Sequence, residues 1–235
     1  MDAPPCARHH GRCPGSYHSA RQYRGACFFH DDDYARYLAY LGELADKFEC
    51  AVHAYCLMTN HVHLLLTSRR ADGSALLMKH LGQRYVQHVN RTYARSGTLW
   101  EGRFRSCLVD AEPYLLACQR YVELNPVRAA MVRHPRQYRW SSYRFNAEGK
   151  ATNLIVPHEL YHRLGRSAQA RHEAYRALFQ TAPEPAVVED IRQATNGGFV
   201  LGSARFAQKI AHALGRRVER GKPGRPARAT GSVAS

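Results

Sequence analysis

The sequence has no long hydrophobic run, comparatively few acidic residues and no Cys-x-x-Cys pair among its 235 residues. Its longest apolar runs fall far short of the roughly 20 residues that a membrane helix needs, so we expect no part of the chain to span a bilayer. The N-terminus has no apolar stretch of signal-peptide length, which argues against secretion. The seven cysteines are odd in number and scattered, which favours reduced thiols in the cytoplasm over a disulfide framework.

The scarcity of acidic residues leaves a strongly basic chain. There are 34 Lys and Arg against 19 Asp and Glu, a net charge of +15 with neutral histidine. Residues 196–235 hold eight basic residues and one acidic residue. Such an excess favours a polyanionic partner, because each cation placed on a phosphate releases counterions. A merely soluble basic surface is the alternative. A lipid surface is a weaker alternative as the partner, because we expect no strongly amphipathic helix beside the basic run.

Hydrophobic periodicity and turn residues predict an α+β domain. We expect strands at residues 17–22, 51–58 and 61–67, a strand or strand pair within 99–109, and helices at 31–48, 74–95 and 110–124. The order strand, helix, strand, strand, helix, strand is that of the ferredoxin-like split βαβ fold, an antiparallel sheet with helices on one face. The helix at 110–124 is left over from this order. Further helical stretches are expected around 157–164, 172–179 and 204–214.

Two histidines stand two residues apart in the second strand of a predicted hairpin. His61 and His63 therefore share one face, about 7 Å apart at their Cα atoms, and their imidazoles could chelate one divalent ion. Val62, Leu64 and Leu66 face the other way and are expected to pack under the helices, leaving the histidine face open. Spacing alone does not distinguish this metal site from a pair of surface histidines.

A tyrosine and a carboxamide share one face of the helix at 110–124. Tyr121 and Asn125 are four residues apart, about 6 Å along the axis. A helical tyrosine more often packs in a core than acts as a nucleophile, but a carboxamide at this spacing could complete the ligand shell of a metal. A phenol has a pKa of about 10, so attack on phosphorus needs a nearby cation, such as the metal, Arg120 or Arg128, to favour the phenolate.

Four blocks in this order resemble the signature blocks of the REP-associated tyrosine transposases, a branch of the single-tyrosine His-hydrophobic-His, insertion-sequence-200-like transposases. The blocks are HAYCLMTNHVHLL at residues 53–65, GTLWEGRFR at 97–105, RYVELNPVRA at 120–129 and WSSY at 140–143. The resemblance covers about residues 14–145. Four blocks in the right order are a far more specific signal than His-x-His alone.

The resemblance implies a ferredoxin-like nuclease that binds single-stranded or hairpin DNA at palindromic repeats and uses Mg or Mn. It makes His61, His63 and Asn125 the metal ligands and Tyr121 the nucleophile. Attack by Tyr121 would leave a 5′-phosphotyrosyl enzyme and a free 3′-hydroxyl. Because the tyrosyl bond keeps the phosphodiester energy, a second 3′-hydroxyl could reverse the step and join strands without ATP.

The resemblance also places other residues on the DNA. Trp100 would be a stacking platform for an unpaired base, with Arg103 and Arg105 on phosphates or guanine edges. Arg120 and Arg128 are further candidate DNA-binding residues. For Trp100, a buried core aromatic is the alternative interpretation.

Four segments are expected from these patterns: a flexible leader at residues 1–13, a transposase catalytic domain at 14–146, a helical basic DNA-binding appendage at 147–220 and a disordered basic tail at 221–235. The partner is expected to be DNA and not a membrane, with the protein as a monomer or homodimer in the cytoplasm. Two alternatives remain open. One is a metal-dependent hydrolytic nuclease in which water replaces Tyr121, and the other is a catalytically retired protein that only binds hairpin DNA.

Overall fold

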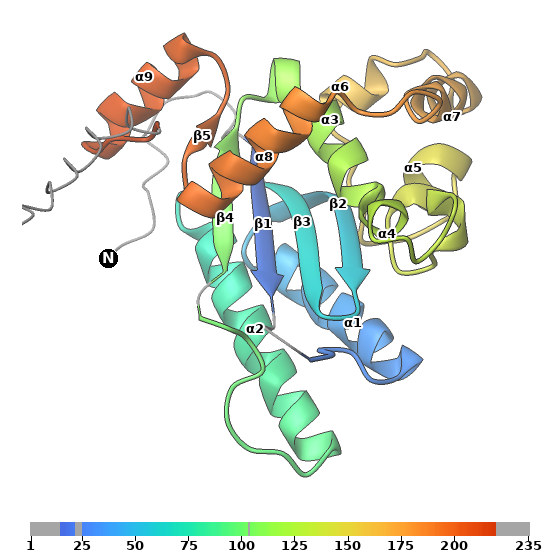
Figure 1. The fold of residues 1–235 in the computed structure, drawn as a ribbon, viewed down its shortest axis with the longest axis vertical. Coiled ribbons are helices and arrows are strands. Elements are labelled where there is room, and N and C mark those ends of the chain that lie inside the picture. Colours follow the sequence, from blue (N-terminus) through green and yellow to red (C-terminus); the bar gives the residue numbers. More distant parts are fainter. Residues whose placement is uncertain (1–14, 22–24, 103, 220–235) are drawn as a thin grey trace, which may run out of the picture.

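The computed structural model describes residues 15–21, 25–102 and 104–219, and its centre is a five-stranded sheet with helices on both faces (Figure 1). The strands are β1 (Gly15–Arg21), β2 (Cys50–Met58), β3 (His61–Ser68), β4 (Arg105–Val109) and β5 (Val200–Leu201). They lie in the order β2-β3-β1-β4-β5. β5 pairs with β4 in parallel, and the other neighbours pair antiparallel. The leader at 1–13 and the tail at 221–235 lie outside the described residues.

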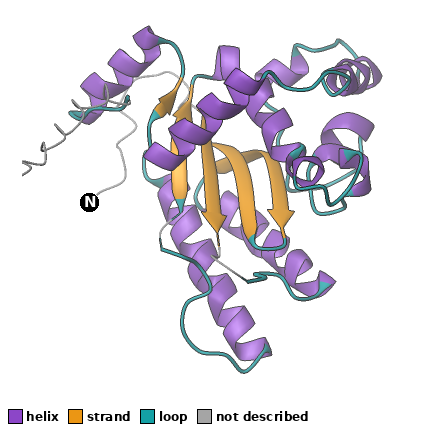
Figure 2. Ribbon diagram, in the orientation of Figure 1, coloured by secondary structure: helices purple, strands orange, loops and turns teal. Residues whose placement is uncertain are grey.

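The helices, drawn in purple in Figure 2, pack around the sheet. Their order is the one expected for the first part of the chain, and further helices follow it. They are α1 (Asp31–Lys47), α2 (Gly73–Thr92), α3 (Ala111–Glu123), α4 (Asn125–Arg128), α5 (Tyr143–Glu148), α6 (Glu159–His162), α7 (Ala168–Ala177), α8 (Pro185–Gly197) and α9 (Ala204–Leu214), with a 3₁₀ turn at Pro135–Gln137. The order β1-α1-β2-β3-α2-β4 confirms the ferredoxin-like split βαβ arrangement. In the described part of the chain, no helix combines the length and apolar character needed to cross a membrane.

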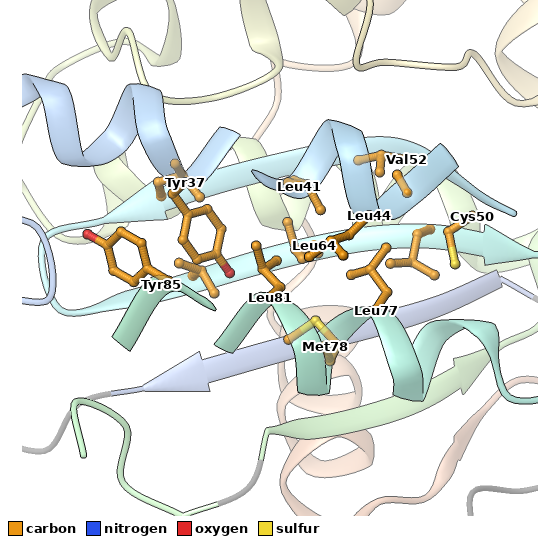
Figure 3. Close-up of a cluster of buried hydrophobic side chains, with 14 of the residues drawn as sticks. Tyr37, Leu41, Leu44, Cys50, Val52, Leu64, Leu77, Met78, Leu81 and Tyr85 are labelled. Atoms are coloured by element: carbon orange, nitrogen blue, oxygen red, sulfur yellow. The ribbon is translucent and has the colours of Figure 1, made fainter. Parts of the chain in front are cut away.

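Helices α1 and α2 cover one face of the sheet. Tyr37 and Leu41 lie about one turn apart on α1, and Leu81 comes from α2. All three residues are at most 1% exposed. They meet Leu64 of β3 in the core shown in Figure 3. Alternate residues of β3 supply this face because successive side chains of a strand point to opposite sides of the sheet. The sequence therefore placed these two helices correctly.

The opposite face of the sheet is covered as well. Leu65 of β3 and Val109 of β4 are fully buried in a second core with Cys118 of α3 and Ile191 of α8. The expectation of helices on one face is thus incomplete, because α3, the helix left over from the predicted order, and α8 cover the second face. The expectation of an open histidine face is wrong, since α3 packs on it and His63 is only 6% exposed.

The loop before β4 differs from its prediction. The expected strand over 99–109 begins only at Arg105, and the residues before it form bends and turns. Gly97 and Gly102 have φ values of 87° and 71°, a region that side-chain-bearing residues rarely adopt and that interrupts an extended strand. The side chain of Trp100 turns inward to pack beside α2 instead of continuing a strand.

The residues after 146 pack into the same body as those before it. Ala147 and Tyr175 join Tyr143 in a third core, and Leu201 of β5 belongs to the second. The boundary at 147 stays a prediction from sequence, but the segments on its two sides are not separated by a linker.

Candidate active site

The two histidines lie at the start of β3, directly after the turn that joins it to β2. Their side chains share the α3 face of the sheet because they are two residues apart in a strand. The ring centroids of His61 and His63 are 4.7 Å apart, with the ring planes at 85°. His61 is half-buried, whereas His63 lies beneath α3. The predicted pairing of these imidazoles is therefore present.

Asn60 orients the first of these histidines. The Nδ1 atom of His61 hydrogen-bonds the side-chain oxygen of Asn60 at 2.6 Å. With the proton on Nδ1, the lone pair of the neutral ring lies on Nε2, the nitrogen then able to bind a metal. Asn60 was not predicted as a site residue, although its position in the turn directly before His61 was visible in the sequence.

His63 is held in its neutral form. Burial lowers its pKa well below the usual 6.5, and the nearby His61 and Arg128 lower it further, while a hydrogen bond with Asn125 raises it. A neutral imidazole keeps a lone pair, which is the form that binds metals.

Tyr121 and Asn125 come from the junction of α3 and α4. Pro126 stands in the first turn of α4, where its missing N–H costs little, so α3 ends at Glu123 and a new turn begins. The Nδ2 atom of Asn125 donates to the carbonyl oxygens of Tyr121 and Val122 at 3.0 and 3.2 Å. Since its nitrogen is used in this way, the carboxamide oxygen is the atom of Asn125 that could bind an ion.

The tyrosine lies against the histidine pair. The ring centroids of Tyr121 and His63 are 6.1 Å apart, and the tyrosine side chain is 8% exposed. His61, His63, Tyr121 and Asn125 therefore form one cluster between β3 and the end of α3, as the sequence predicted.

Arg128 holds the tyrosine from the other side. Its guanidinium carbon lies 4.0 Å from the centroid of the Tyr121 ring, and its Nη2 donates to the Tyr121 carbonyl oxygen at 2.8 Å. A cation over an aromatic face is attracted by the ring. Arg128 thus fixes the tyrosine side chain and brings a positive charge beside it.

The donor set of this cluster suits a divalent ion. Two imidazole nitrogens and one carboxamide oxygen are ligands that several divalent ions accept, and three protein ligands leave positions for phosphate and water. Within residues 15–21, 25–102 and 104–219, no group of three or more His, Cys, Asp or Glu side chains could hold an ion. Asn125 remains the predicted third ligand.

The other predicted DNA-contact residues are spread over the molecule. Trp100 packs on the α1–α2 face, opposite to Tyr121, with its ring 6.1 Å from that of Tyr85. Arg105 is exposed and donates to Asn196 Oδ1 at 2.8 Å. Arg120 donates to the carbonyl oxygen of Thr181 at 2.6 Å, linking α3 to the loop before α8. Arg103 lies outside the described residues.

A large pocket lies away from the tyrosine site. Its volume is about 1070 Å³, and it lies along α2, with Met78, Gly82, Trp100 and Phe104 in its walls. It opens on the face of the sheet away from Tyr121. Trp100 therefore reaches a surface hollow, but one remote from the histidine pair.

Glu123 is a second residue that the sequence analysis missed. It is fully buried two residues after Tyr121, and its carboxylate accepts hydrogen bonds from Ser142 Oγ at 2.6 Å, Asn146 Nδ2 at 2.8 Å and Tyr175 OH at 2.9 Å. Burial raises its pKa to about 7, although these three donors lower it. Glu123 thereby ties α3 to α5 and α7. Its position inside the block at residues 120–129, two residues after Tyr121, was the available signal.

The ferredoxin-like sheet thus carries a histidine pair beneath a tyrosine of α3. Residues 17–125 match the family model described as "Transposase IS200 like". This part of the chain is similar to that family of DNA transposases. The resemblance seen in the sequence is thus confirmed.

Solved structures support the fold. A REP-associated tyrosine transposase bound to a REP hairpin matches 65% of this chain and 90% of its own, with a TM-score of 0.51 and 12% sequence identity. At this identity the likeness shows the fold alone. A candidate transposase from Deinococcus radiodurans, 18% identical, matches 56% of this chain and 92% of its own with a TM-score of 0.36, too low to carry an argument. None of the curated proteins matches the chain significantly.

Proposed function

We propose that the chain nicks and rejoins single-stranded or hairpin DNA at palindromic repeats through a covalent tyrosyl intermediate, with Tyr121 as the nucleophile. One observation carries this proposal. Tyr121 lies against His63, with Asn125 and His61 in the same cluster, although α3 and β3 are far apart in the chain. A packing tyrosine needs no such polar neighbours.

The side chains have separate roles in this reaction. The Tyr121 oxygen attacks the scissile phosphorus, the bond from phosphorus to the 3′-oxygen breaks, and the 3′-hydroxyl leaves with a proton. His61, His63 and Asn125 would hold Mg or Mn, which when bound polarises the phosphate and offsets its charge. Arg128 keeps the phenol in place. Attack by a second 3′-hydroxyl on the phosphotyrosine reverses the step and joins the strands.

The finer features of the proposal rest on the chain's composition. The net charge of +15 supports a nucleic-acid partner. The cysteines of the described residues, Cys27, Cys50, Cys56, Cys107 and Cys118, are buried free thiols, which supports a reducing compartment such as the cytoplasm. We propose a monomer or a homodimer as the working unit.

A denaturing gel tests the proposal. A labelled hairpin oligonucleotide is incubated with Mg or Mn and either the wild-type protein or Tyr121→Phe. We expect a labelled band that migrates with the wild-type protein and is absent from the variant. Cleavage by both proteins without an adduct would instead indicate a hydrolytic nuclease. Binding without cleavage would indicate a retired hairpin-binding protein.

A further inference from the structure

Helix α9 is anchored to the edge of the sheet at both of its ends. The hydroxyl of Ser203 accepts from the backbone N–H of Phe206 at 3.2 Å and caps its first turn. Before the helix, β5 pairs with β4, and after it the backbone N–H of Val200 donates to the carbonyl oxygen of Val218 at 2.9 Å. In Figure 1, α9 lies at the far side of the sheet from the β2–β3 hairpin.

The helix has one apolar and one basic face. Ala207 is buried and Phe206, Ile210 and Leu214 are half-buried on the side toward the protein. The exposed residues on the other side are Arg205, Gln208, Lys209 and His212, with Arg216 one turn further. Helical geometry places the first four within one stripe, and Arg216 lies just after the helix, which ends at Leu214 with Gly215 as its left-handed cap. The expectation that no strongly amphipathic helix lies beside the basic run is therefore wrong. The alanines of α9 are small and only weakly apolar, so the helical spacing of its larger apolar residues is hard to detect in the sequence.

The cations of this surface have no protein partners among the residues that the structure describes. Within the described residues, no ion pair or side-chain hydrogen bond involves Arg205, Lys209 or Arg216. By contrast, Arg163 at the C-terminal end of α6 is paired with Glu112. The one acidic residue among residues 196–219 is Glu219. A row of unpaired cations on a fixed helix is an electrostatic site for a polyanion.

We propose that the exposed face of α9, defined by Arg205, Gln208, Lys209 and His212, forms with Arg216 just after the helix a second DNA-binding surface that takes a DNA duplex, such as the stem of a hairpin. This rests on the proposed function, in which the chain acts on DNA. The surface lies outside residues 17–125, the part of the chain that the family model matches.

Two features favour a duplex over other polyanions. Surfaces for single strands use aromatic side chains for stacking, and the exposed face of α9 carries none. A lipid surface requires the apolar face of an amphipathic helix, which here is directed toward the protein, with Ala207 only 3% exposed. The major groove of DNA, by contrast, admits an α-helix that presents polar side chains.

A charge-removal variant with a matched control tests this surface. The variant carries Arg205→Gln, Lys209→Gln and Arg216→Gln. The control carries Lys150→Gln, Arg166→Gln and Arg192→Gln, which remove the same charge from exposed positions elsewhere. The probes are a fluorescent blunt DNA duplex, an unstructured single strand and vesicles of anionic phospholipid, each titrated in a series of salt concentrations. Circular dichroism and thermal unfolding check that both variants fold like the wild type.

We expect the α9 variant to bind the duplex at least about tenfold more weakly than the control does, with the slope of log affinity against log salt reduced by about 2 to 3. Single-strand affinity should change by less than about twofold relative to the control. Equal loss of duplex affinity in both variants, or equal loss for duplex and single strand, would overturn the proposal. Vesicle binding that is lost with the α9 charges would assign the surface to lipid instead.

Adduct formation separates this proposal from the proposed function. At saturating hairpin DNA, the α9 variant should form the Tyr121 adduct at the wild-type rate, because α9 is remote from the histidine pair. If the wild-type protein formed no adduct but the α9 variant still lost duplex binding, the proposed chemistry would fail and the surface would stand.

Discussion

Asn60 contacts a candidate metal ligand without being a ligand itself. Its oxygen accepts from His61 Nδ1 at 2.6 Å and so fixes which nitrogen of His61 carries the lone pair. We predict that Asn60→Ala weakens Mn²⁺ binding by about 10- to 100-fold, because partners of metal-bound histidines typically have effects of this size. Calorimetry or Mn²⁺ electron paramagnetic resonance measures the affinity. Asn60→Asp keeps an acceptor and should retain most of it. Unchanged affinity in Asn60→Ala would show that the contact does not orient the ring.

Arg128 contacts the tyrosine and is not a candidate metal ligand. We predict that Arg128→Gln slows adduct formation at least about tenfold, because the ring loses its cation and the Tyr121 carbonyl loses its charged donor. Single-turnover kinetics at saturating DNA and metal measure this rate. The matched control is Arg133→Gln, at an exposed position nearby in the chain. If Arg128→Gln reduced DNA affinity but left the rate unchanged, Arg128 would be a DNA contact, as first expected, and not a positioning residue.

The junction of α3 with α5 and α7 depends on one buried carboxyl group. The pKa of Glu123 is about 7 in the folded protein, against an ordinary value of 4.5, so the folded state binds the proton more tightly than the unfolded state does. Its contribution to stability is therefore complete below about pH 4.5 and is lost as the pH rises toward about 7. The size expected from this shift is on the order of 3 kcal/mol.

Glu123→Gln should remove this dependence, because an amide cannot ionise. The difference in free energy of unfolding between wild type and variant, measured with urea from pH 4.5 to 8, should change across that interval and level off above it. A difference that stays constant over the whole range would show that Glu123 does not titrate there.

The sequence predicted best those elements whose signals are local. The strands of the β2–β3 hairpin and helix α1 begin and end within about one or two residues of their predicted positions, because alternation, a tight turn and acidic residues at the helix start all agree. Helix α8 was missed, although Pro185 in its first turn and Gly198 just after its end were available signals. β5 was missed because two residues carry no detectable period.

The spacing of residues within one strand or one helix predicted each of the two residue pairs of the site, but not that the two pairs lie together. His61 with His63, and Tyr121 with Asn125, could each be paired by strand or helix geometry. Nothing in either spacing says that α3 packs over the histidines, and only the resemblance joined them. Glu123 and Asn60 could not be assigned because their roles depend on tertiary partners.

At the scale of the whole molecule, the residues after 146 act as part of the transposase body. Tyr175 donates to Glu123, and Ile191 and Leu201 fill the core beneath β4. We predict that a chain ending at residue 146 loses cooperative unfolding or unfolds at least about 10 °C lower, because it uncovers buried apolar surface and removes a partner of a buried carboxyl group. The matched control ends at residue 219. Equal melting temperatures of the two truncations, by calorimetry, would show a separable appendage.

The central claim is that Tyr121 becomes covalently joined to DNA. The most direct measurement is mass spectrometry of the wild-type protein after reaction with a hairpin oligonucleotide, followed by nuclease and trypsin digestion. Cleavage after Arg120 and Arg128 releases residues 121–128, which contain Tyr121 as their one tyrosine. We expect a nucleotide mass on this peptide, localised to Tyr121. A nucleotide on any other peptide, or cleaved DNA with no modified peptide, would contradict it.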